Sequence, residues 1–173
     1  MTADARWRVQ RVENGRFELL DPAAGVDEPT IATLLVAPTR DRGEVRQATG
    51  EVWSVVRDAR DFRFHAAPGR LLAVATKPSM IRERFDLDLA VLGRELSVQP
   101  VRPWWRRWRI ADQRETVGTV ERQRLPLGCH ELRLPRATVA PDELSVVVGW
   151  LVALVSTDPP RGWRAASGAH AGR

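Results

Sequence analysis

The 173-residue chain contains one cysteine, Cys129, one lysine, Lys77, and no tyrosine. A single cysteine excludes an internal disulfide framework, and it fits a reducing compartment. The N-terminal residues are charged and mixed rather than apolar, so we expect no signal peptide and predict a cytoplasmic protein. Arginine supplies all but one of the 27 basic side chains, and the formal net charge is +5. This charge favours an anionic partner, although the abundance of arginine and alanine also fits a compositional bias.

The sequence has no apolar run long enough to cross a bilayer as a helix, which takes about 20 residues. The most hydrophobic stretch is residues 144–155, which carries no charge. Pro141 and two carboxylates precede it, as is typical of a helix start, and Pro159-Pro160 ends any helix beyond it. Its many valines also suit a strand, but its length and boundaries favour a helix. We therefore predict a core helix over about residues 141–156, with Leu144, Val148, Trp150, Leu151 and Leu154 buried.

Most of the chain before this helix alternates polar and apolar residues over segments of 5–7 residues, the pattern of half-buried strands. Turn sequences such as Glu13-Asn14-Gly15 and Ala67-Pro68-Gly69 separate these segments. We predict a mainly β fold: a closed antiparallel β-barrel of about 12 strands that encloses the hydrophobic C-terminal helix. The barrel and helix form a single domain over residues 1–156, and residues 157–173 form a flexible tail.

Three segments carry a resemblance to a known family: "GRELSVQP", "RWRIADQRETVGTVER" and "LSVVVGWLVALVS". Together they resemble the tubby C-terminal-like superfamily, in its LURP-one-related and scramblase-like branch. The resemblance implies a twelve-stranded barrel threaded by a hydrophobic helix. It also implies a role at phospholipid headgroups. The cysteine-rich and calcium-binding segments of scramblases are missing, so lipid scrambling is not implied.

The sequence "VRPWWRRWRIAD", residues 101–112, is the strongest candidate binding feature. Arginine forks match phosphate geometry, and tryptophan favours the headgroup level of a membrane. We therefore predict contacts with anionic phospholipid or a membrane surface, at the inner membrane face, through Arg102, Trp105, Arg106, Arg107 and Arg109. The region from residue 94 to residue 124 holds eight arginines and four carboxylates, which is most of the net charge.

Other interpretations of this feature remain open. Trp104 or Trp108 can fill the core while the arginines lie over the barrel beside acidic partners. The basic surface can also serve as a scaffold for an acidic protein partner. Nucleic-acid binding uses the same residue types but lacks a recognised motif here.

The sequence shows no catalytic motif and no metal-ligand spacing. Cys129 and His130 are neighbours in a predicted strand, so their side chains point to opposite faces and do not form a shared site. We predict a non-enzymatic module without a cofactor or metal, although a site assembled from distant residues is not visible to sequence reasoning.

Overall fold

The structure is a computed structural model that describes residues 4–22, 28–78, 84–90, 93, 95–101, 107–113, 115–123, 128–135 and 141–158. The described elements are twelve strands and one helix: β1 (Asp4–Glu13), β2 (Arg16–Leu20), β3 (Thr30–Val36), β4 (Arg42–Gln47), β5 (Val52–Asp58), β6 (Asp61–Ala66), β7 (Arg70–Thr76), β8 (Phe85–Leu89), β9 (Glu95–Pro100), β10 (Arg107–Asp112), β11 (Glu115–Arg122), β12 (Cys129–Pro135) and α1 (Pro141–Ser156).

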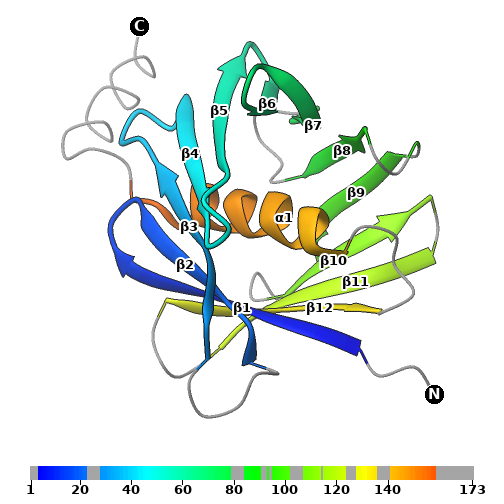
Figure 1. Ribbon diagram of the computed structural model, residues 1–173. Coiled ribbons are helices and arrows are strands. Elements are labelled where there is room, and N and C mark those ends of the chain that lie inside the picture. The colour runs from blue at the N-terminus through cyan, green and yellow to red at the C-terminus, as the bar shows by residue number, and fades with distance from the viewer. Residues whose placement is uncertain are drawn as a thin grey trace, which may run out of the picture.

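The strands form one closed barrel in which each strand pairs antiparallel with its neighbours in the sequence. Pairing of β1 with β12, from Asp4 opposite Pro135 to Gln10 opposite Cys129, closes the barrel. Figure 1 shows the strands arranged around α1. The predicted fold class, a closed antiparallel barrel of about 12 strands with a C-terminal helix, is therefore confirmed.

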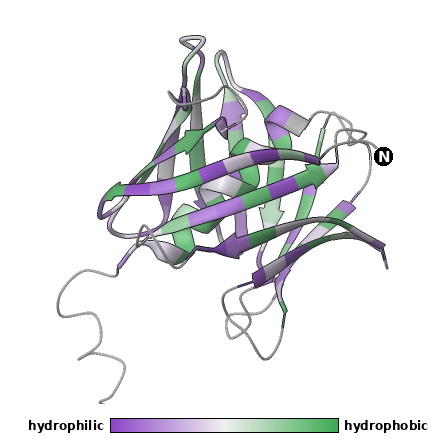
Figure 2. Ribbon diagram, turned by 90° about the horizontal axis from the view of Figure 1, so that it is seen from below, coloured by the Kyte–Doolittle hydropathy of each residue, from purple (hydrophilic) through white to green (hydrophobic). Residues whose placement is uncertain are grey.

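Side chains alternate between the interior and the outer face along each strand, as the period of two predicted. In β6, Phe62 and Phe64 are buried while Arg63 is exposed. In Figure 2, hydrophobic and hydrophilic positions alternate along the strands of the barrel. This alternation leaves the interior lined with apolar side chains that need an apolar partner.

Helix α1 is that partner, because it is apolar on all sides and nearly all of it is buried. Leu144, Val148, Trp150 and Leu151 are each 0% exposed, and Leu154 is 6% exposed. Trp150 stacks edge-on against Phe64 at 5.5 Å, and its indole N–H donates to the Leu35 carbonyl at 3.0 Å. The predicted core residues of the helix therefore all lie in the barrel interior.

The two residues after α1 are fixed to the barrel, although the sequence placed them in a flexible tail. Thr157 is 1% exposed and its hydroxyl donates to the Ala153 carbonyl at 2.7 Å. Asp158 accepts a hydrogen bond from Arg11 at 2.8 Å, and its backbone N–H donates to Asn14 at 2.9 Å. The ordered domain thus reaches Asp158, and the rest of the predicted tail, residues 159–173, lies outside the described residues.

Candidate functional site

The strand of the predicted site, β10, presents Arg107 and Arg109 on the outer face of the barrel. Arg102, Trp105 and Arg106 lie outside the described residues. Trp108 is 6% exposed and points inward beside other core residues. Trp108 is therefore a core residue, which agrees with the interpretation that tryptophan in this segment fills the core.

Both described arginines of β10 have partners on neighbouring strands. Arg107 forms an ion pair of 3.1 Å with Glu121, which lies directly opposite on β11. With the Gln99 amide turned so that its oxygen faces β10, the guanidinium of Arg109 donates to that oxygen across the pair with β9. Glu121 offsets the charge of Arg107, whereas the neutral amide of Gln99 leaves the charge of Arg109 in place.

The remaining charged residues can be grouped by the end of the barrel at which they lie, because alternate turns of an up-and-down barrel lie at the same end. We call the end where α1 begins the entry end, and the end where α1 finishes the exit end. Arg11 and Asn14, near the β1–β2 turn, contact the residues that follow α1, which places this turn at the exit end. Each end comprises the turns located there together with the two terminal residues of every strand and of α1.

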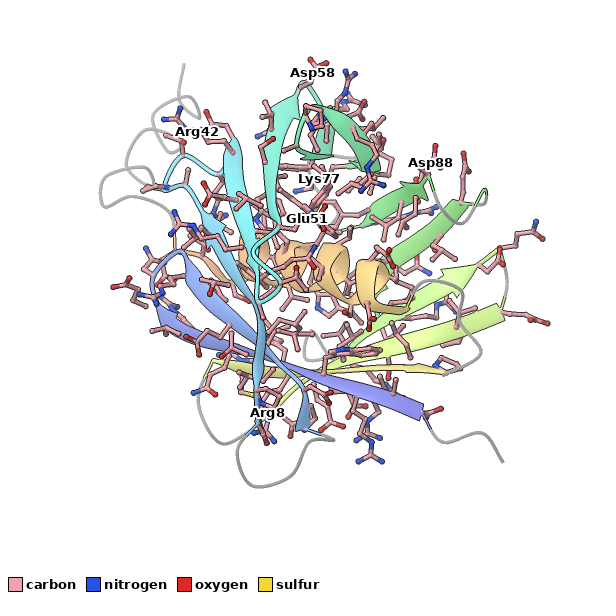
Figure 3. All side chains as sticks on the ribbon, viewed as in Figure 1. Arg8, Arg42, Glu51, Asp58, Lys77 and Asp88 are labelled. Carbon is pink, nitrogen blue, oxygen red and sulfur yellow. The ribbon has the colours of Figure 1, made fainter. Side chains whose placement is uncertain are left out.

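The entry end is strongly acidic among the described residues. It has two basic residues against nine carboxylates, a net charge of −7. The basic residues are Arg46 and Arg70, and the acidic ones are Asp4, Asp21, Glu28, Glu51, Asp88, Glu95, Asp112, Glu115 and Asp142. Glu51 and Asp88 are labelled in Figure 3.

The exit end carries the opposite sign. Its described residues comprise nine basic side chains against seven carboxylates, a net charge of +2. The basic residues are Arg16, Arg40, Arg42, Arg57, Arg60, Lys77, Arg84, Arg107 and Arg122, and the acidic ones are Glu13, Asp41, Asp58, Asp61, Asp86, Glu121 and Asp158. Segments outside the described residues contain Arg82, Glu83, Arg102, Arg106 and Arg124 where their flanking residues lie at the exit end, and Asp27, Arg94, Arg114 and Arg136 where these lie at the entry end. Among the described residues, the barrel has one basic and one strongly acidic end.

His130 is a titratable side chain that points inward near the exit end, on the same face of β12 as Leu132. Burial, together with the charge of nearby Arg122, lowers its pKa from 6.5 to about 4. Its Nδ1 atom is buried and has no hydrogen-bond partner among the described residues. The imidazole is therefore neutral at physiological pH, which is the form that an apolar interior tolerates.

Cys129 points to the outer face, opposite to His130, yet it is 0% exposed. Burial raises the pKa of its thiol, which keeps the sulfur protonated. Arg8, which influences this thiol, forms an ion pair of 2.7 Å with Glu28 from the connection after β2. Cys129 and His130 thus face different environments, as the strand pattern predicted.

A scan against protein-family models finds no match, and searches of curated proteins and of solved structures find none either. The resemblance to the tubby C-terminal-like superfamily therefore stays a prediction. No helix in the described part of the chain has the length and apolar character needed to span a bilayer. Within the same residues, no group of His, Cys, Asp and Glu side chains is arranged to hold a metal ion.

Sequence reasoning missed the charge difference between the two ends of the barrel. The signal was present: in a barrel of sequentially paired strands, alternate turns share an end, so their charges can be summed in two groups. The ion pair between Arg107 and Glu121 gave no such signal, because it depends on the register of β10 against β11.

Proposed function

We propose that this chain is a non-enzymatic module that binds an anionic phospholipid surface peripherally through the exit end of the barrel. The observation that carries the proposal is the contrast in charge: +2 at the exit end and −7 at the entry end among the described residues. An anionic surface attracts the first and repels the second, so the barrel approaches it with the exit end.

Tryptophan favours a membrane over the other anionic partners. The segment that joins β9 to β10 contains Trp104-Trp105 between Arg102 and Arg106, and its flanking residues, Val101 and Arg107, lie at the exit end. Tryptophan rings prefer the headgroup level of a bilayer, where arginine meets lipid phosphates. Arg102, Trp105 and Arg106, which the sequence predicted as contacts, are therefore included in the proposal.

The test is co-sedimentation of the protein with vesicles of phosphatidylcholine alone and with vesicles that also contain phosphatidylserine. The protein is expected to bind only the anionic vesicles, and less at high salt because salt screens the attraction. A variant with Gln at positions 102, 106, 107 and 109 is expected to bind more weakly. Absence of binding to anionic vesicles at low salt would rule out the proposal, and an acidic protein partner would then be the next hypothesis.

A further inference from the structure

Three turns on one side of the exit end form a continuous structure. They are residues 37–42, which end with the first residue of β4, residues 57–60, which begin with the last two residues of β5, and Lys77-Pro78 after β7. We call them the three-turn sector. The backbone N–H of Arg57 donates to the Asp41 carbonyl at 2.7 Å, and the N–H of Lys77 donates to the Arg60 carbonyl at 2.9 Å. These hydrogen bonds hold the turns side by side.

The three-turn sector has more cations than carboxylates: five basic residues against Asp41 and Asp58. A hydrogen bond from Thr39, together with the charges of Arg42 and Arg57, lowers the pKa of the Asp41 carboxyl, so this carboxylate faces two of the five cations. Figure 3 labels Arg42 and Lys77 together with Asp58. Asp58 already forms an ion pair of 3.0 Å with Arg63, and Asp41 accepts a hydrogen bond from Thr39.

The backbone of this sector adopts conformations that L-amino acids rarely take. Arg40 has φ 57° and Ala59 has φ 53°, both in the left-handed region that favours glycine. Each of these positions therefore costs free energy relative to glycine. The turn at residues 37–42 thus holds an arginine where local structure alone favours a residue without a side chain.

The described residues in the rest of the exit end are nearly neutral in sum. Most of its arginines are paired with carboxylates on the same or the neighbouring strand: Arg16 with Glu13, Arg84 with Asp86 and Arg107 with Glu121. Outside the sector and its flanking Asp61, the described exit end has four basic and four acidic residues. Among the described residues, the surplus positive charge of this end therefore lies in the three-turn sector.

We infer that the three-turn sector is a direct contact with lipid phosphates, in addition to residues 101–112, which we call the Arg/Trp strand. This inference rests on the proposed function and gives its surface a location that the sequence did not indicate. Neighbouring strands lie about 4.8 Å apart, so the cations from β4 to β7 are distributed over roughly 14 Å. That spread lets separate side chains contact separate phosphate groups on a membrane.

The inference is tested with three variants that each remove positive charge. Arg42→Gln, Arg60→Gln and Lys77→Gln together neutralise the sector. Arg6→Gln, Arg46→Gln and Arg70→Gln together remove the same charge from the side of the barrel nearer the entry end. Arg107→Gln with Arg109→Gln neutralises the described part of the Arg/Trp strand. Thermal melting of each variant by circular dichroism confirms that the barrel remains folded.

Partitioning is measured on phosphatidylcholine vesicles with and without phosphatidylserine, and inorganic triphosphate serves as a soluble competitor. A basic residue at an anionic surface contributes about 1 kcal/mol, so the sector variant is expected to partition roughly 100-fold more weakly. The control variant loses its cations near the entry end, and its partitioning is expected to weaken by about threefold or less. Triphosphate is expected to displace the wild-type protein from the vesicles. If it does not displace the sector variant that remains bound, this result would also support the inference.

The inference and the proposed function fail in different ways. If the wild type binds anionic vesicles and the sector variant binds equally well, the sector is not the contact, while the proposed function stands. If the wild type binds no anionic vesicle, both fail. Equal losses in the sector and control variants would show that only net charge matters, which would also overturn the inference.

Discussion

Trp150 determines which side chains its surroundings can accept. A Cβ atom at Gly43 would lie 2.5 Å from Trp150 and 2.3 Å from the Leu35 carbonyl, so there is no room for a side chain at this position of β4. Gly149, in α1, differs: an added Cβ would meet Leu34, Leu19 and Val9 at 3.4 to 3.5 Å, which is ordinary contact. Gly43 thus has no space for a side chain, whereas Gly149 has space for a methyl group.

The substitution Gly43→Ala is expected to destabilise the protein by about 2 kcal/mol or more, because the new methyl group overlaps backbone and indole atoms. Gly149→Ala is expected to be stabilising by up to about 1 kcal/mol, since alanine favours a helix interior over glycine. Urea unfolding of both variants measures the free energies. An unchanged midpoint for Gly43→Ala would show that β4 moves away from Trp150 without loss.

His130 makes the stability of the protein depend on pH. Its pKa is about 4 in the folded state and 6.5 as the ordinary value, so the unfolded chain binds more protons between these limits. The free energy of unfolding therefore has its full value above pH 6.5. It decreases by about 3 kcal/mol in all as pH falls towards 4. His130→Gln is expected to show a smaller loss over this range in urea unfolding. Parallel curves for the two proteins would contradict the assignment.

At the level of elements, alternation of polar and apolar residues predicted the strands, and the structure places strands at those segments. The signal was clear because one face of the strands is buried in the barrel interior, while the other face is largely polar. The start of β1 is less visible in the sequence: the strand begins at Asp4, and Ala5 and Arg6 continue its pairing with β12. Pairing with a distant strand leaves no local mark in the sequence.

Helix α1 is expected to accept no charge inside the barrel. Val148 is 0% exposed, so Val148→Asp would bury an unpaired carboxylate and prevent folding. Ser54→Asp on the exposed face of β5 is the matched control and is expected to leave the protein folded. Circular dichroism and size-exclusion chromatography distinguish the outcomes. A soluble Val148→Asp protein with wild-type melting would show that α1 is not enclosed.

The contacts of Thr157 and Asp158 place a sharp boundary at the end of the domain. Removal of residues 159–173 is expected to leave the melting temperature within about 2 °C, because no described contact of the barrel depends on them. Removal of residues 157–173 also deletes the Arg11–Asp158 ion pair and the buried Thr157 hydroxyl, and is expected to lower it by several degrees. Equal melting of the two truncations would show that the contacts contribute nothing.

At the level of the whole molecule, the surface that we infer from the structure differs from the site that the sequence predicted, and that site stays a prediction. Clustered arginines drew attention to residues 101–112, but the register places Glu121 beside Arg107 and Gln99 beside Arg109. Arg42, Arg60 and Lys77 are far apart in the sequence, and only the hydrogen-bonded turns bring them together. A composition-based search finds runs of charge, whereas this surface is built from single residues on successive turns.

The difference in charge between the ends predicts a fixed orientation on a membrane. Anionic vesicles are expected to slow hydrogen exchange of the exit-end turns at residues 37–41 and 59–60. Turns at the entry end, residues 48–51 and 67–69, are expected to exchange as in the free protein. Mass spectrometry of peptides from both ends measures this. Equal protection at both ends would indicate that the barrel lies on its side.

The order of the elements also has a consequence for how the molecule forms. All twelve strands precede α1 in the chain, so during synthesis the wall emerges before the element that fills it. The wall without α1 exposes an apolar interior, and its closing pair, β1 with β12, joins segments more than 100 residues apart. Such long-range closure is slow. A chain that lacks α1 would therefore leave the apolar interior of the wall uncovered, and such exposed surface is prone to aggregate and to bind chaperones.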